Sequence, residues 1–304
     1  MNGQIAGVLG PVVSTFGATT GDLDAVLFRA NIRAHMAEGL SGVVVAGSTG
    51  EAALLDERER QQVAEWARPL VPDDRWLIAG VGAESTRLCS RRARAAAERG
   101  VDAVLAVAPH YYTSAMTSEA LATHFRRVAD ESPVPVFLYN IPKYAHFSLD
   151  PELVLELASH GNIAGIKDSS GDLKLLGAYL AAQSARFTVL TGSGGGFYPA
   201  LELGARGGIL AVSLFAGRLS TGLYAAWTQG DKASARRAQE RLIPLAQTIV
   251  GSLGVAGVKR ALDLVGLAGG LPRLPLSPLE SGARAQVSAL LEASGLLPMS
   301  AAPA

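Results

Sequence analysis

The sequence predicts an α/β fold: a closed (β/α)8 TIM barrel with a C-terminal helical extension. Three observations support this. Short apolar runs recur along the chain, a helical pattern follows each run, and the alternation stops after Gly230. The runs do not alternate polar with apolar residues, which is typical of parallel strands buried on both faces. A doubly wound open sheet is the alternative fold.

Eight candidate strands account for the first 230 residues. The interval between successive strand starts has room for one strand, one helix and two loops, as in a βα repeat. The strands are expected at residues 7–13, 42–46, 76–81, 103–107, 135–139, 163–167, 188–191 and 207–212.

Helix boundaries carry their own signals. Asp22 is expected to cap the helix that ends near residue 38, and Asp56 with Glu59 three residues later predicts a capping box. Asp150 followed by Pro151 predicts an N-cap with proline in the first helical turn. Glycines where helices are expected to stop are Gly100, Gly204 and Gly230.

After Gly230 the pattern is helical only. Helices are expected at residues 231–250, 255–265 and 278–293, with a proline- and glycine-rich linker at 269–278. We therefore expect residues 1–230 to form the barrel domain and residues 231–304 the helical extension. The last residues, 299–304, are expected to be loosely held.

Composition excludes several classes of protein. Of the 304 residues, 49% are apolar and 18% charged, which excludes a disordered chain. Lys and Arg total 27, as do Asp and Glu, and no basic stripe is present. Nucleic acid or an anionic membrane is therefore not expected as the main partner. No apolar stretch is long enough to span a membrane, and the N-terminus lacks signal-peptide features.

The cysteine and histidine content argues against disulfides and against a metal site. The one cysteine, Cys89, cannot form an internal disulfide and fits a reducing compartment, so a cytoplasmic location is expected. The five histidines are scattered and form no HxH or HExxH pair. No metal site is therefore expected.

Lys167 is the most informative residue. The chain has five lysines, and only Lys167 ends an apolar strand. Its amine is expected in the mouth of the barrel, at the strand ends where barrel enzymes carry their sites. Desolvation there disfavours the ammonium form, and a neutral amine can attack a ketone to form a Schiff base. The alternative is a structural ion pair with Asp168. Loops or helix surfaces are expected to hold Lys143, Lys174, Lys232 and Lys259.

Two other strand ends could contribute to the same site. Tyr139 ends the preceding strand, and neighbouring strands lie about 5 Å apart, so its hydroxyl could relay protons to Lys167. A core tyrosine is the alternative. The turn at residues 47–50 offers backbone N–H groups and the hydroxyls of Ser48 and Thr49 to an anion such as a carboxylate. An ordinary tight turn is the alternative, and the turn lacks the lysine of a nucleotide-binding loop.

A glycine-rich segment follows the seventh strand, at residues 192–196. The spacing of a dinucleotide fingerprint fails, because the third glycine position holds Phe197. A phosphate cradle remains open, since barrels often bind phosphate there, and close packing of the loop is the alternative.

Four segments in order carry a family resemblance: GSTGE at 47–51, PHYY at 109–112, YNIP at 139–142 and GIKDSSGD at 165–172. The sequence resembles the dihydrodipicolinate synthase/N-acetylneuraminate lyase superfamily of Schiff-base aldolases, from about residue 7 to residue 279. The stretches TSAMTSEAL and VADESPVPVFLYNIP look most like the 4-hydroxy-2-oxoglutarate aldolase branch.

The resemblance implies roles for particular residues. Lys167 would form an imine with pyruvate or another 2-oxo acid, and Tyr139 would move protons. A tyrosine of the Tyr111–Tyr112 pair would join this relay, inserted in some members by a neighbouring subunit, and Tyr112 is the candidate. The substrate would be contacted by Ser48, Thr49, Tyr111 and Ser169, and by the backbone at Gly192 and Leu210.

The resemblance also implies no metal or organic cofactor and a homotetramer built as a dimer of dimers. Departures from the family pattern concern the second substrate. Residues 143–146 lack the arginine with which the synthases bind the distal carboxylate of the aldehyde. Residues 193–195 lack the acidic groups with which the N-acetylneuraminate lyases hold a polyol. Leu214 or Phe215 replaces a common asparagine.

The leading hypothesis is a class I pyruvate lyase that reversibly cleaves a 4-hydroxy-2-oxo acid, such as 4-hydroxy-2-oxoglutarate, to pyruvate and an aldehyde. The alternative keeps the imine chemistry in a 4-hydroxy-tetrahydrodipicolinate synthase or a sugar-acid dehydratase. A non-catalytic 2-oxo-acid-binding barrel is a third hypothesis. The presence of both Lys167 and Tyr139 argues against it, because binding alone needs neither.

Overall fold

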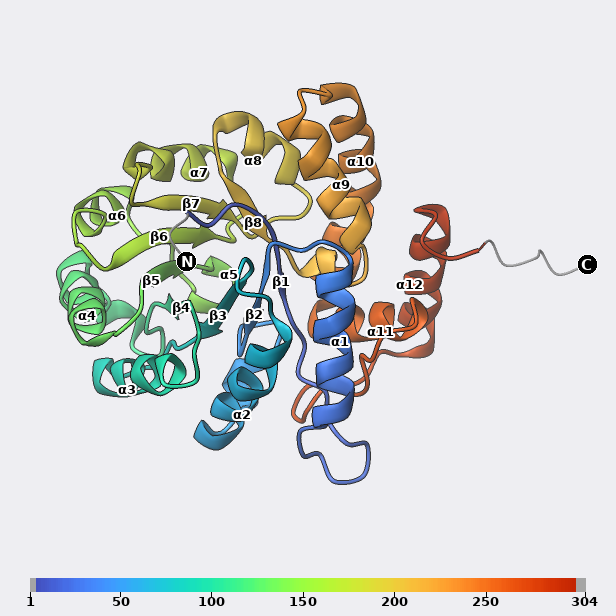
Figure 1. The fold of residues 1–304 in the computed structure, drawn as a ribbon, viewed down its shortest axis with the longest axis horizontal. Helices are drawn as coiled ribbons and strands as arrows, with labels where there is room; N and C mark the ends of the chain where they lie inside the picture. Colours follow the sequence, from blue (N-terminus) through green and yellow to red (C-terminus); the bar gives the residue numbers. More distant parts are fainter. Residues whose placement is uncertain (1–3, 299–304) are drawn as a thin grey trace, which may run out of the picture.

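Eight parallel strands close into a barrel in the computed structural model, which describes residues 4–298 (Figure 1). Each strand pairs with the next in sequence, and β8 pairs with β1, so the sheet has no edge. This confirms the predicted barrel and excludes the doubly wound sheet. The strands are β1 (Gly7–Pro11), β2 (Gly42–Val45), β3 (Trp76–Gly80), β4 (Ala103–Val107), β5 (Val136–Asn140), β6 (Ile163–Asp168), β7 (Thr188–Thr191) and β8 (Gly207–Ile209).

Helices surround the barrel, and the C-terminal helices gather on one side of it (Figure 1). Helix α10 packs against α9, and α12 packs against α11. The split into domains at residue 230 stays a prediction. The helices are α1 (Ala25–Ala37), α2 (Glu57–Ala67), α3 (Thr86–Ala97), α4 (Ser118–Glu131), α5 (Pro142–Ala145), α6 (Pro151–Leu157), α7 (Leu173–Tyr179), α8 (Phe197–Leu203), α9 (Gly217–Thr228), α10 (Lys232–Pro244), α11 (Gly254–Leu264) and α12 (Ser281–Ala293).

Most helix ends lie where the sequence predicts them. The capping box of Asp56 and Glu59 is present, and Asp150 caps α6. The expected N-cap Asp22 is wrong: Asp24 caps α1 by accepting from two backbone N–H groups. Asp22 lies instead in a short turn, where its carbonyl accepts from the backbone N–H of Gly17.

Three expected elements end early. Strand β1 stops at Pro11, and β8 stops at Ile209 because residues Ala211–Leu214 form a 3-10 turn. The helix expected to reach residue 250 is α-helical only to Pro244 and continues as a π-helix over Leu245–Ser252. Proline has no N–H for the α-helical ladder, and π-helical turns are rare and often lie at functional sites.

Strand side chains build two separate apolar cores. One fills the space between the sheet and the helices. The other fills the barrel interior and includes Leu9, Leu105, Phe137, Tyr139 and Ile209. Because side chains alternate along a strand, the residue after each of these points outward. This alternation decides which strand-end residues reach the mouth of the barrel.

The described residues contain neither a membrane-spanning helix nor a cluster of metal-ligating side chains. No helix in residues 4–298 is long and apolar enough to cross a membrane. Within the same range, no group of three or more His, Cys, Asp or Glu side chains is placed to hold a metal ion. The expectation for residues 299–304 lies outside the described residues.

Candidate active site

Register between β5 and β6 brings Tyr139 and Lys167 side by side. The two residues are direct partners in the parallel ladder. The Lys167 Nζ donates to the Tyr139 hydroxyl at 3.1 Å and lies 4.2 Å from the centre of its ring. Both side chains are buried, at 5% and 6% exposure. The sequence placed these groups close together, and the structure puts them in hydrogen-bond contact.

The ion pair of Lys167 with Asp168 does not form. Asp168 is buried and points to the other side of the strand, where its carboxylate accepts from the Asn140 side-chain amide at 2.7 Å and from Ser170. Asn140 in turn accepts from the backbone N–H of Leu149, which fixes the loop after β5. Burial raises the pKa of Asp168, and the Asn140 and Ser170 hydrogen bonds oppose this. The sequence analysis missed Asn140.

The pKa of the Tyr139 hydroxyl is lowered although the side chain is buried. Burial by itself raises its pKa, but the Lys167 charge and hydrogen bonds with Ser169, Lys167 and Ser48 together outweigh burial. The net pKa lies below the ordinary value for tyrosine. A phenol of lowered pKa next to an amine can accept and return protons more readily near neutral pH.

Lys167 opens into a cavity of about 620 Å³ at the C-terminal ends of the strands. We call this the Lys167 cavity. The predicted residues Ser48, Thr49, Tyr139, Ser169 and Gly192 also line it. Among the described residues of its wall, two are lysines and none is acidic. The field in the cavity therefore favours an anionic substrate.

The turn that carries Ser48 and Thr49 has an unusual backbone. Ala46 before it and Glu51 after it both have positive φ, at 49° and 58°. A positive φ is uncommon outside glycine, and such residues cluster at functional sites. At Gly50 an added Cβ would lie 2.8 Å from the Val12 carbonyl, so only glycine fits there. The turn therefore has a single, tightly specified shape.

The wall opposite Tyr139 comes from β7 and β8. A Cβ added to Gly192 would lie 1.9 Å from the Ser169 Oγ and 3.0 Å from the Lys167 Cε, so the glycine backbone packs directly on the lysine. Leu210 does not line the cavity; Ile209 does. Leu210 belongs to the core between sheet and helices, and Ile209 to the barrel interior. The resemblance implies a part for the Leu210 backbone, and the described cavity wall has Ile209, one position earlier, in that place.

Tyr111 and Tyr112 do not reach Lys167 within one chain. Their rings contact each other at 5.0 Å and are 77% and 69% exposed. The carboxylate of Glu84 accepts from the backbone N–H groups of His110 and Tyr111, which fixes the segment. Any part that these tyrosines play at Lys167 would have to come from a neighbouring copy of the chain.

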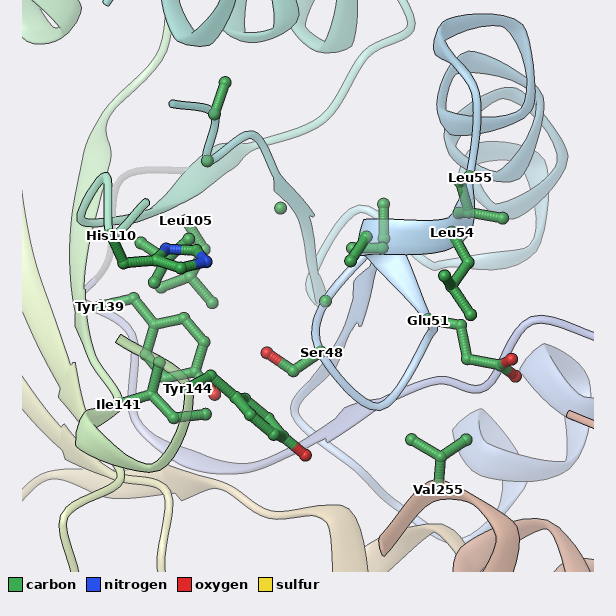
Figure 2. A pocket seen from close by; sticks show the side chains of 18 of the residues that line it. Ser48, Glu51, Leu54, Leu55, Leu105, His110, Tyr139, Ile141, Tyr144 and Val255 are labelled. Carbon is green, nitrogen blue, oxygen red and sulfur yellow. The ribbon is translucent and has the colours of Figure 1, made fainter. Parts of the chain in front are cut away.

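A second cavity, of about 900 Å³, adjoins the first and shares Ser48, Tyr139 and Tyr144 with it. Figure 2 shows the Ser48 hydroxyl pointing toward Tyr139, with Tyr144 beside them. Although this cavity is larger, Lys167 is absent from its wall, so the amine chemistry belongs to the smaller one. His110 and Tyr112 lie on the wall of the larger cavity.

Of the other lysines, Lys143 lies exposed on α5, as expected, whereas Lys259 does not lie on a surface. Lys143 lines the Lys167 cavity, and its Nζ donates to the Gly251 carbonyl of the π-helix at 2.7 Å. Lys259 is buried at 1% exposure and forms an ion pair with Glu51, so its predicted surface position is wrong. A signal was present: Lys259 lies four residues after Val255 and three before Leu262, on the apolar face of α11.

Comparison with known proteins agrees with this geometry. Residues 4–294 match the model of the Dihydrodipicolinate synthetase family. A 4-hydroxy-tetrahydrodipicolinate synthase from Exiguobacterium sp. is 32% identical, covering 90% of this chain and 92% of that protein. An uncharacterized DapA-like lyase from Halobacterium salinarum is 37% identical, covering 96% and 94%. The crystal structure of YagE from E. coli K12 in complex with pyruvate has a TM-score of 0.90 at 31% identity, covering 96% and 99%.

The site therefore has a buried lysine near the end of a barrel strand, in hydrogen-bond contact with a tyrosine hydroxyl and close to the turn of Ser48 and Thr49. The chain belongs to the dihydrodipicolinate synthetase family and is a lyase of that family. This confirms the superfamily predicted from the sequence.

Proposed function

We propose that this chain is a pyruvate-dependent carbon–carbon lyase in which Lys167 forms an imine with the C2 carbonyl of pyruvate. The observation that carries the proposal is the contact of the Lys167 Nζ with the Tyr139 hydroxyl at 3.1 Å, at the inner end of a cavity with no acidic group among the described residues of its wall. The similarity to YagE, whose structure was solved with pyruvate, supports it.

Each residue has a defined part in the proposal. The amine of Lys167 adds to the ketone, and water leaves as the imine forms. Tyr139 passes protons to and from the carbinolamine oxygen, and Ser48 and Thr49 hold the pyruvate carboxylate. The protonated imine draws electrons from C3, whose proton is lost to give an enamine. The enamine carbon then attacks an aldehyde, and the reverse sequence cleaves the same bond.

Two aldehyde partners are in competition. The names of the relatives support a 4-hydroxy-tetrahydrodipicolinate synthase, in which the enamine condenses with aspartate semialdehyde, and we place it first. The second candidate is cleavage of a 4-hydroxy-2-oxo acid such as 4-hydroxy-2-oxoglutarate, the leading expectation from sequence. The absence of arginine from the described wall of the Lys167 cavity argues against aspartate semialdehyde, because Lys143 is a weaker carboxylate clamp. The distal carboxylate of 4-hydroxy-2-oxoglutarate also needs a partner, and Ser169, Ser193 or Lys143 of the cavity wall would hold it.

The experiment has two parts. Incubation with pyruvate and borohydride should attach one reduced pyruvyl group per chain to the peptide that holds Lys167, and Lys167→Ala should abolish both label and activity. Labelling at Lys143 or Lys259 would overturn the assignment. The kcat/KM values for aspartate semialdehyde condensation and 4-hydroxy-2-oxoglutarate cleavage, measured on one preparation, then choose between the candidates. A tenfold advantage for either reaction assigns the chain to it.

The proposal includes a homotetramer in the cytoplasm. The exposed pair of Tyr111 and Tyr112 supports an assembly, because two adjacent exposed aromatic rings are typical of a contact surface. In this assembly Tyr112 of one subunit completes the proton relay in a neighbour, and Tyr111 contacts the substrate.

A further inference from the structure

A buried ion pair connects the anion-binding turn to the C-terminal extension. Glu51, directly after the turn 47–50, places its Oε1 2.5 Å from the Nζ of Lys259 on α11. The two side chains are 0% and 1% exposed. The same Nζ donates to the Leu271 carbonyl at 2.9 Å. In Figure 2 the Glu51 carboxylate points away from Tyr139 and lies on the side of the cavity where α11 places Val255.

The linker after α11 closes on the same carboxylate. The backbone N–H of Arg273 donates to the second oxygen of Glu51 at 2.7 Å. The Arg273 guanidinium then bonds both oxygens of Glu59 on α2, each at 2.6 Å. It also donates to the carbonyls of Leu54 and Gly21. Both oxygens of Glu51 are therefore held by residues more than 200 positions away in the sequence.

Glu51 also has a strained backbone. Its positive φ costs free energy for a residue with a side chain, and such a conformation persists only where surrounding contacts impose it. Within the turn, the backbone N–H of Glu51 donates to the Ser48 carbonyl, and the Gly50 carbonyl accepts from the Ser14 hydroxyl. The backbone of Glu51 is therefore bonded directly to the backbone of Ser48, the residue that faces the Lys167 cavity.

Stability alone gives a weak reason for this arrangement. Taking an ammonium and a carboxylate out of water costs as much as or more than their attraction returns, and apolar replacements of such pairs are often neutral or stabilising. A buried pair of this kind does fix position, because neither charge can move without losing its partner. Helix α11 also supplies Val255 and Val258 to the cavity wall, so the pair ties that wall to the turn.

We propose that Lys259 and Glu51 are positioning residues that hold the Ser48–Thr49 turn in its carboxylate-binding shape, so that the C-terminal extension sets the affinity of the barrel for its 2-oxo acid. This rests on the proposed function, since the affinity concerned is that for pyruvate at Lys167.

The experiment measures the pyruvate concentration that gives half-maximal borohydride trapping at Lys167, together with KM, kcat and the melting temperature. Lys259→Met removes the cation and leaves Glu51 buried without its partner. The double variant Glu51→Gln/Lys259→Met removes both charges and so avoids a buried unpaired carboxylate. Arg68→Met is the matched control, because it breaks the Arg68–Asp102 pair, which joins the 3-10 turn after α2 to the residue before β4, at the opposite end of the barrel.

We expect both variants at position 259 to raise the half-saturating pyruvate concentration and KM at least about tenfold. This is the loss of affinity expected when one charge-assisted hydrogen bond to the pyruvate carboxylate is displaced. Trapping at saturating pyruvate should remain, since Lys167 and Tyr139 are untouched. The control should lower the melting temperature and leave pyruvate affinity unchanged.

A half-saturating pyruvate concentration and KM within twofold of wild type in either folded variant would overturn the inference. Failure of the double variant to fold would also overturn it, because the pair would then have a role in stability alone. If the wild-type chain traps no pyruvate at Lys167, the proposed function itself fails, and the inference fails with it.

Discussion

At the scale of single residues, the chemistry depends on which side of a strand each side chain occupies. Lys167 and Tyr139 point into the barrel at the same level, and Asp168, one position later, points away into its own hydrogen bonds. The sequence identified Lys167 because it alone among the lysines ends an apolar strand. The part given to the Leu210 backbone came from the family resemblance, and the described cavity wall has Ile209 in its place.

Tyr139→Phe should lower kcat by about 10²- to 10⁴-fold, because it removes the hydroxyl that the proposal uses to move protons. Pyruvate affinity should change much less, since Ser48 and Thr49 are untouched. Steady-state kinetics with pyruvate as the varied substrate separates the two effects. Full turnover in the variant would make Tyr139 a core residue only.

At the scale of elements, local sequence signals set helix ends well when the capping partners lie within the same helical turn. Asp56 and Glu59 satisfy each other's backbone N–H groups within four residues, so no distant contact is needed. Asp22 and Asp24 are both acceptable caps by sequence. The short antiparallel bridge between Phe16 and Leu23 places Asp22 in the turn before the helix, where its carbonyl accepts from Gly17. Asp24 is therefore left as the N-cap.

Asp24→Ala should therefore destabilise the protein by about 1 kcal/mol, the typical contribution of an N-cap side chain. Asp22→Ala is the matched control two residues away, and its free energy of unfolding should stay within about 0.5 kcal/mol of wild type. Urea denaturation of the two variants gives the comparison. If Asp22→Ala lowers the free energy of unfolding more than Asp24→Ala does, Asp22 is the N-cap, as the sequence suggested.

At the scale of the whole molecule, burial and assembly determine behaviour that no single element predicts. Two of the scattered histidines, His35 and His124, are buried at 0% and 5% exposure. Burial lowers the pKa of each to about 4. In the unfolded chain they titrate near 6.5, so between pH 6.5 and 4 the unfolded state binds protons that the folded state does not.

Stability should therefore be unaffected by these histidines above pH 6.5 and should fall as the pH drops below it. From pH 7.5 to pH 5, the free energy of unfolding should decrease by about 2 kcal/mol per histidine. Urea unfolding at the two pH values measures this, and His35→Phe should remove about half of the decrease. A pH-independent free energy over this window would show that both rings are protonated in the folded state.

Assembly can be tested by subunit complementation. Lys167→Ala and Tyr112→Phe each inactivate a different half of the proposed shared site. Mixed subunits should regain activity, because a Tyr112→Phe chain keeps its lysine and receives an intact Tyr112 from its neighbour. When equal amounts of the two variants pair at random, about half of the pairs are mixed, and one of the two sites in each mixed pair is complete. The mixture should therefore have about one quarter of the wild-type activity. Sedimentation should give a tetramer, and an inactive mixture would exclude the shared relay.

The sequence by itself determined the repeating βα pattern, the lysine at the sixth strand end, the tyrosine beside it and the hydroxyl-bearing turn. These follow from local rules: apolar runs, side-chain alternation and the position of strand ends in a barrel. The tertiary structure decided which of two adjacent residues faces the cavity, that Lys259 is buried against Glu51, and that Tyr111 and Tyr112 face outward. Those outcomes depend on contacts between segments far apart in the chain, and desolvation and packing at such contacts have no counterpart in local sequence.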